Sequence, residues 1–256
     1  MIRKAARPRS ATPVVTYALI GICCAVFVLG PTSGLTVWPT PPGAESSGPA
    51  QLAAQSAYFA HWGVVPEELW HGPPGELLTP LTALFLHGNW LHLLGNMLFL
   101  HVFGAMAEER MGRVAFALFY LAAGVLALLG YAAAHAHSEQ TLVGASGAIS
   151  GVLGAFLYLF PRARVTSLFP FLFFLPLRFP AWAVLLFWFV LQWLAARTAD
   201  DRPGVAYLAH VVGFSLGFLY AWARYRRAVR VKDAAGPHEG PRSPGGQPPT
   251  PERSQP

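Results

Sequence analysis

Long apolar runs separated by short polar segments dominate the pattern of hydrophobic and polar positions along the chain. A helix needs about 20 mostly apolar residues to cross a bilayer, within a range of roughly 17–25. Six segments are therefore expected to span the membrane: 14–30, 77–106 (part of it a loop), 114–134, 144–160, 179–196 and 203–223. This pattern predicts an all-α polytopic membrane protein built as a bundle of six transmembrane helices.

The remaining segments suggest a simple organisation around these helices. Residues 1–13 form a short N-terminal segment, 14–227 form one membrane domain, and an outer loop covers about 31–76, of which 31–48 is expected to be flexible. Residues 165–177 contain two prolines and are too short to span a bilayer, so we expect an interfacial or re-entrant segment there. The Pro/Gly-rich stretch 228–256 has no apolar periodicity and predicts a disordered tail.

Composition and charge agree with a membrane protein. Hydrophobic residues make up 54% of the 256 positions and charged residues only 12%, against about 25% charged residues in soluble domains. The basic residues flank the apolar runs, which is typical of membrane topology rather than of a nucleic-acid-binding surface. Cytoplasmic loops are enriched in Lys and Arg, and six spans with both termini cytoplasmic would place 16 of the 18 Lys and Arg residues on that side. The pattern fits a bacterial plasma membrane and predicts no nucleic-acid partner. Adjacent Cys23 and Cys24 lie in an apolar run and indicate no disulfide framework.

A serine and a histidine lie at similar predicted depths in two of the spans. Ser146 begins the fourth span and His210 follows shortly after the start of the sixth, and both spans run inward from the outer surface. Small residues four apart would let these two helices approach closely; they are Gly147 with Gly151 and Gly213 with Gly217. Taken alone, "GASGAISG" is more often a packing motif, but close approach would also bring Ser146 within reach of His210.

Other polar residues narrow the possible chemistry. His92 and Asn96 share one face of the second span, and His87 precedes them. No His-Glu-x-x-His string exists, so no metal is expected in an active centre. The chain's aspartates all lie outside the spans, which leaves a Ser-His dyad rather than a triad: Asp200, Asp201 and Asp233. The remaining loop histidines are expected to be solvated: His61, His71, His135 and His137.

The strings "HGNWLHLLGN", "GASG" and "AHVVGFSLG", on spans two, four and six, resemble the rhomboid intramembrane serine proteases. The resemblance covers about 75–224 and implies the family's six-helix core. It implies that Ser146 is the nucleophile and His210 the general base, with His92 and Asn96 contributing to an oxyanion hole and His87 in a supporting position. The motif glycines fit the same pattern: Gly144, Gly147, Gly213 and Gly217.

The resemblance also implies a substrate and a partner class. It predicts hydrolysis of transmembrane proteins near the outer membrane boundary, with membrane lipid as the surrounding partner and no cofactor; it does not define the oligomeric state. One departure is visible, because Leu78 and Thr79 stand where many rhomboids carry a Trp-Arg pair. Two other classes remain open: an inactive rhomboid-like protein that binds membrane clients, and a small transporter, which would need ion-liganding carboxylates within its spans.

Overall fold

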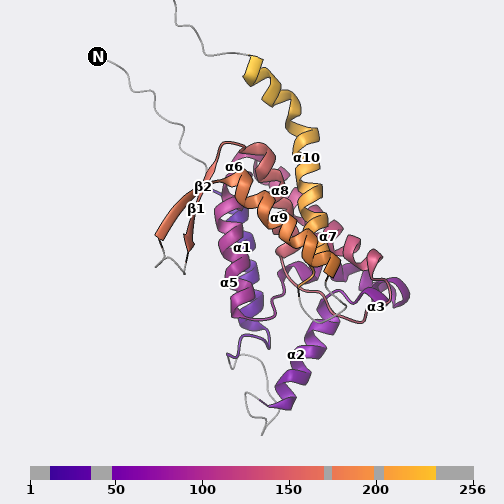
Figure 1. Ribbon diagram of the computed structural model, residues 1–256. Coiled ribbons are helices and arrows are strands. Elements are labelled where there is room, and N and C mark those ends of the chain that lie inside the picture. The colour runs from indigo at the N-terminus through magenta and orange to yellow at the C-terminus, as the bar shows by residue number, and fades with distance from the viewer. Residues whose placement is uncertain (1–11, 36–47, 170–174, 199–204, 235–256) are drawn as a thin grey trace, which may run out of the picture.

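The computed structural model describes residues 12–35, 48–169, 175–198 and 205–234 as a mostly helical bundle (Figure 1). Within these ranges three continuous helical segments are long and apolar enough to cross a membrane, and two apolar helices are shorter. The helices that correspond to predicted spans are α1 (Val14–Leu29), α5 to α6 (Trp90–Met111), α7 (Arg113–Ala134), α8 (Ser146–Leu159), α9 (Ala181–Thr198) and α10 (Tyr207–Ala234). The predicted helical membrane fold is confirmed, and the helices are consistent with six spans.

The second predicted span divides into a loop and a helix, as its length required. Short helical turns come first: η1 (Pro74–Leu78), α4 (Thr79–Thr82) and η2 (Ala83–Phe85). A continuous helix follows, in which a π-helical turn, η3 (Leu100–Gly104), separates α5 (Trp90–Phe99) from α6 (Ala105–Met111). This helix runs beyond the expected end at 106 and includes Glu108, a carboxylate that the predicted span left out.

Glu108 completes the start of the first helix. Its side chain is 2% exposed and accepts hydrogen bonds from Val15 N–H at 3.0 Å, Thr16 N–H at 2.7 Å and the Thr16 hydroxyl at 2.8 Å. Pro13, at the N-cap of α1, supplies no side-chain cap. Glu108 therefore satisfies amide groups that a helix start leaves free, and its negative charge is favourable at that end of the helix dipole. These bonds give Glu108 a structural role.

The outer loop is partly helical and is tied to the loop before α8. It contains α2 (Pro49–Trp62) and α3 (Pro66–His71), whereas residues 36–47, within the stretch expected to be flexible, lie outside the described ranges. Backbone hydrogen bonds of 3.0 and 2.7 Å pair Val64 with Leu142. In Figure 1, α2 projects away from the bundle, whereas α3 lies against it.

Leu78 and Thr79, which stand in place of the expected Trp-Arg pair, have different environments. Leu78 is 67% exposed, and buried Thr79 donates a hydrogen bond of 2.7 Å from its hydroxyl to the Glu76 carbonyl. This bond stabilises the turn between η1 and α4 without a charged side chain.

Two segments in the C-terminal half add detail to the predicted organisation. Residues 165–169 and 175–177 lie in two antiparallel strands, β1 (Arg164–Phe169) and β2 (Leu175–Pro180), which project from the side of the bundle in Figure 1; the interfacial position expected for this segment stays a prediction. Prolines are tolerated in this two-stranded sheet because both strands are edges. In addition, α10 continues to Ala234, so the tail boundary expected at 228 falls inside the helix; residues 235–256 lie outside the described ranges.

Helix α8 occupies the centre of the bundle and contacts α10 through bare backbone. All its residues from Gly147 to Phe156 are buried. A Cβ atom added to Gly213 would collide with the Gly147 carbonyl oxygen, and one added to Gly217 would collide with the Gly151 carbonyl oxygen. Small residues permit this approach, which drives helix association in lipid through close packing. The glycine pairs predicted from the sequence thus bring α8 and α10 together.

Candidate active site

Ser146 is the first residue of α8 and follows a tight turn. Gly144 has a φ of +127°, a conformation that favours glycine, and its N–H donates to the Ala83 carbonyl at 2.9 Å. The 14 residues of α8 span about 21 Å at a rise of 1.5 Å per residue, less than the roughly 30 Å of a bilayer's hydrocarbon core. A helix of this length cannot reach both membrane surfaces, and a turn at an inset end is tolerated when its backbone groups are bonded within the protein.

The structure brings Ser146 and His210 into direct contact. The Ser146 hydroxyl donates to His210 Nε2 at 2.8 Å, and His210 Nδ1–H donates to the Gln192 side-chain oxygen at 2.7 Å. His210 is only 7% exposed, and the Trp188 ring stacks beside it with centroids 6.0 Å apart. The imidazole is thus held in the tautomer whose free Nε2 can take the serine proton.

Gln192, on α9, is a residue that the sequence reasoning missed. The available signal was a single amide side chain within the apolar run 179–196, since polar side chains inside a span are usually bonded to a neighbouring helix or functional. The Nδ1 atom that an aspartate would contact in a triad here contacts an amide.

His92 and Asn96 lie on α5, facing the start of α8. The Asn89 side chain caps α5 by accepting from the His92 N–H at 2.8 Å. The Gly88 N–H points to His92 Nδ1 at 3.4 Å, a weak contact that leaves Nε2 as the protonated nitrogen. A Cβ atom on Gly144 would lie 2.8 Å from His92 Nε2, so this donor sits directly against the turn that precedes Ser146.

Asn96 presents an unused hydrogen-bond donor. The residue is 9% exposed, and its buried Nδ2 has no partner among the described residues. Buried donors are nearly always bonded, so an unpaired one calls for an explanation such as a bound water or a substrate atom. A donor held unpaired in this position is suited to an oxygen that becomes negatively charged during a reaction.

One cavity of about 650 Å³ joins these residues. Its lining includes Ser146, His210, His92 and Asn96, and the other lining residues, most of them apolar, come from α5, α8, α9 and the segments that precede α5, α8 and α10. His87 is outside this lining: it is 1% exposed and meets the His92 ring edge-on, with centroids 5.1 Å apart. It supports His92 by packing.

The other histidines of the described ranges lie away from this cavity. His61 packs against Trp62 and His135 stacks on Tyr131. His71 and His137, in contrast, both contact one carboxylate, an arrangement that the sequence did not reveal.

Comparison with known proteins identifies the family. Residues 74–227, more than half of the chain, match the family model for the rhomboid domain. The chain belongs to the rhomboid family. This rhomboid is therefore an integral membrane protein, from a family that acts on transmembrane substrates within the membrane.

Individual rhomboids show the same similarity over part of their length. "Rhomboid protein 1, mitochondrial" of Saccharomyces cerevisiae is 37% identical over 144 residues, which cover 55% of this chain and 40% of that protein. "RHOMBOID-like protein 12, mitochondrial" of Arabidopsis thaliana is 26% identical over 169 residues, covering 60% and 48%. "Rhomboid protease GluP" of Bacillus subtilis is 43% identical over 84 residues, covering 33% and 16%. The matched region spans less than half the length of each relative.

Proposed function

We propose that this rhomboid is a serine endopeptidase that hydrolyses peptide bonds of transmembrane proteins, with Ser146 as nucleophile and His210 as general base. The 2.8 Å hydrogen bond between them, inside a cavity, carries the proposal. As the Ser146 oxygen attacks the scissile carbonyl, His210 Nε2 takes its proton and then passes it to the leaving amine. Water hydrolyses the resulting acyl-enzyme and regenerates the free serine.

The negative oxygen of the tetrahedral intermediate is held by the Ser146 backbone N–H, His92 and Asn96. The N–H of Ser146 is one of the free amides at the start of α8, where the helix dipole also favours negative charge. His92 Nε2 and Asn96 Nδ2 supply side-chain donors from α5. A donor of this kind contributes about 2.7–4 kcal/mol to transition-state stabilisation.

The substrate is a transmembrane segment that unwinds near its outer boundary. An intact helix bonds its own carbonyls, so a scissile bond must leave the helix before Ser146 can attack it. Small or helix-breaking residues lower that cost. The distribution of Lys and Arg supports a topology with both termini on the cytoplasmic side, and we propose a bacterial plasma membrane, with Ser146 near the opposite surface.

Labelling with a fluorophosphonate in detergent tests this function against an inactive client-binding rhomboid. The wild type is expected to be labelled on one serine, and Ser146→Ala is expected to lose all labelling, because only an activated serine reacts with the probe. Ser150→Ala is the matched control: Ser150 lies one turn further along α8, and its hydroxyl is bonded to the Ser146 carbonyl at 2.7 Å. An unlabelled wild type, or equal labelling of Ser146→Ala, would exclude the proposal.

Gln192 orients the general base in this proposal. Gln192→Leu removes the acceptor of His210 Nδ1–H and is expected to lower kcat for cleavage of a model transmembrane substrate by about tenfold, the order of one hydrogen bond's net free energy. KM should stay unchanged, because Gln192 contacts the base rather than the substrate. Gln192→Glu, which keeps an acceptor oxygen, should restore kcat. An unchanged kcat in Gln192→Leu contradicts this role.

A further inference from the structure

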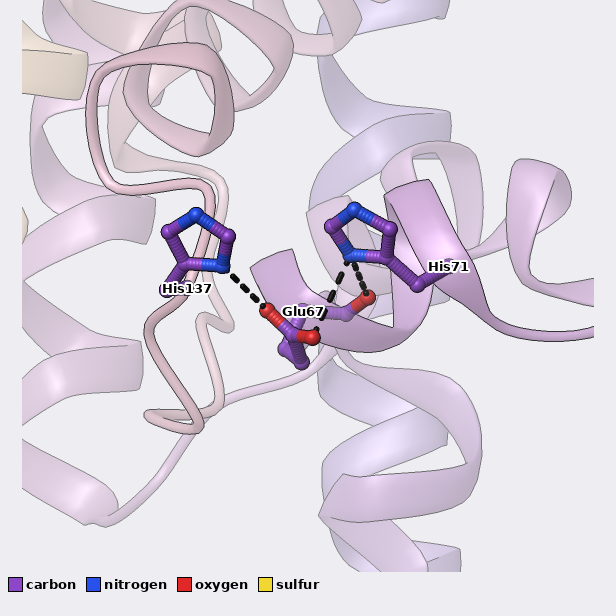
Figure 2. A group of neighbouring side chains, drawn as sticks. All are labelled: Glu67, His71 and His137. Carbon is purple, nitrogen blue, oxygen red and sulfur yellow. Dashed lines mark hydrogen bonds and ion pairs between the residues drawn. The ribbon is translucent and has the colours of Figure 1, made fainter.

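Three side chains of types that can ligate a metal meet outside the cavity beside Ser146, where α3 contacts the loop between α7 and α8. Glu67 and His71 lie one turn apart on α3, and His137 lies in the loop that follows α7. Figure 2 shows the two imidazole rings on either side of the Glu67 carboxylate, each directing a nitrogen at it. The cluster is separate from Ser146 and does not depend on its proposed role.

The distances within this cluster fit a metal ion. His71 Nδ1 lies 3.3 Å from Glu67 Oε1, and His137 Nδ1 lies 3.1 Å from Glu67 Oε2. One ligand atom from each residue falls within 4.8 Å of the others. A tetrahedral zinc ion with bonds of about 2.0–2.1 Å holds its ligand atoms roughly 3.3 Å apart. Binding one ion therefore requires side-chain rotations that shorten separations of up to 4.8 Å to this value and that turn His71 Nδ1 away from the Glu67 main-chain carbonyl, which it contacts at 3.2 Å.

Two hydrogen bonds already hold the two parts of this cluster together. The Glu67 N–H donates to the Ser138 carbonyl at 3.1 Å, and Trp70 Nε1–H donates to the Ala132 carbonyl at 3.0 Å. The site needs little ordering when an ion arrives, which favours binding. Side-chain exposures of 39% for Glu67, 55% for His71 and 87% for His137 leave the ion an open route from solvent.

We propose that Glu67, His71 and His137 form a zinc site that joins α3 to the α7–α8 loop. Two imidazole nitrogens and one carboxylate suit zinc, whereas magnesium and calcium prefer oxygen ligands throughout. Water takes the fourth position. Because the same loop continues into Ser146, the ion fixes a segment that leads to the start of α8.

Calorimetric titration with zinc chloride tests the site directly. The full chain is purified in detergent with a tag that contains no histidine, treated with EDTA and freed of chelator. The wild type is expected to bind one equivalent of zinc, and His71→Ala and His137→Ala should each weaken binding at least about tenfold, since even outer-sphere changes cost that much. His135→Ala is the matched control, because His135 lies in the same loop but bonds the Tyr131 carbonyl at 3.1 Å instead.

Cobalt substitution and thermal unfolding give readouts independent of proteolysis. Cobalt(II) should give the intense visible absorption of a four-coordinate ion in the wild type and in His135→Ala, and lose it in His137→Ala. Zinc should raise the unfolding temperature of the wild type but not of His137→Ala, a variant whose exposed side chain leaves folding intact. No saturable zinc binding by the wild type, or equal affinity in all variants, overturns the proposal.

Discussion

His210→Ala is expected to lower kcat for cleavage of a transmembrane substrate by about four orders of magnitude or more, the loss seen when one member of a serine–histidine pair is removed. Without the imidazole, the Ser146 hydroxyl keeps its proton and is a poor nucleophile. The leaving amine also loses its proton donor. The measurement is single-turnover cleavage of a model substrate in lipid vesicles, where binding and chemistry can be separated.

His101→Ala is the matched control for this variant. His101 also lies within a span, but its ring is exposed on the outside of the bundle and stacks against Tyr17 with centroids 5.8 Å apart. Its removal should leave cleavage unchanged and shows whether losing any intramembrane histidine harms the enzyme. Full cleavage by His210→Ala would remove this residue from the mechanism, and a parallel loss in His101→Ala would point to a general effect on folding.

The sequence contains enough information to place Ser146 and His210 at one depth. Apolar run lengths define the spans, charge distribution orients them, and the four-residue spacing of glycines indicates which faces of two helices meet. Run length and glycine spacing are read from short stretches of sequence, and the charge distribution depends only on the order of the spans. The bond between the two side chains, and the cavity beside it, depend on the rotation of α8 against α10, which no run length determines.

What the sequence could not predict depends on contacts between distant segments. Gln192 stands alone in an apolar run, and only the packing of α9 against α10 gives it a partner. Glu67 and His71 are a recognisable pair at helical spacing, yet His137 joins them from a loop 66 residues beyond His71. The strands β1 and β2 were not predicted because a short apolar run with prolines does not distinguish a strand from other interfacial structure.

Asn96→Ala is expected to lower kcat by about 10²–10³-fold, the range for losing one oxyanion donor. KM should change little, because the donor binds an oxygen that gains its charge only in the transition state. Gly95→Ala is the matched control: Gly95 is the neighbouring cavity-lining residue, and an added Cβ there meets nothing within 4 Å. It should cleave as fast as the wild type.

The stability of Asn96→Ala distinguishes catalysis from structure. Asn96 Nδ2 is buried without a partner among the described residues, so replacing it breaks no bond at that atom and removes an unpaired donor, which is neutral or stabilising. The expected combination is a slow enzyme whose unfolding temperature is equal to or above that of the wild type. A structural asparagine would lose stability and activity together. Unimpaired cleavage by a stable Asn96→Ala would contradict the proposed role of Asn96. The Ser146 N–H and His92 would then be sufficient to stabilise the oxyanion.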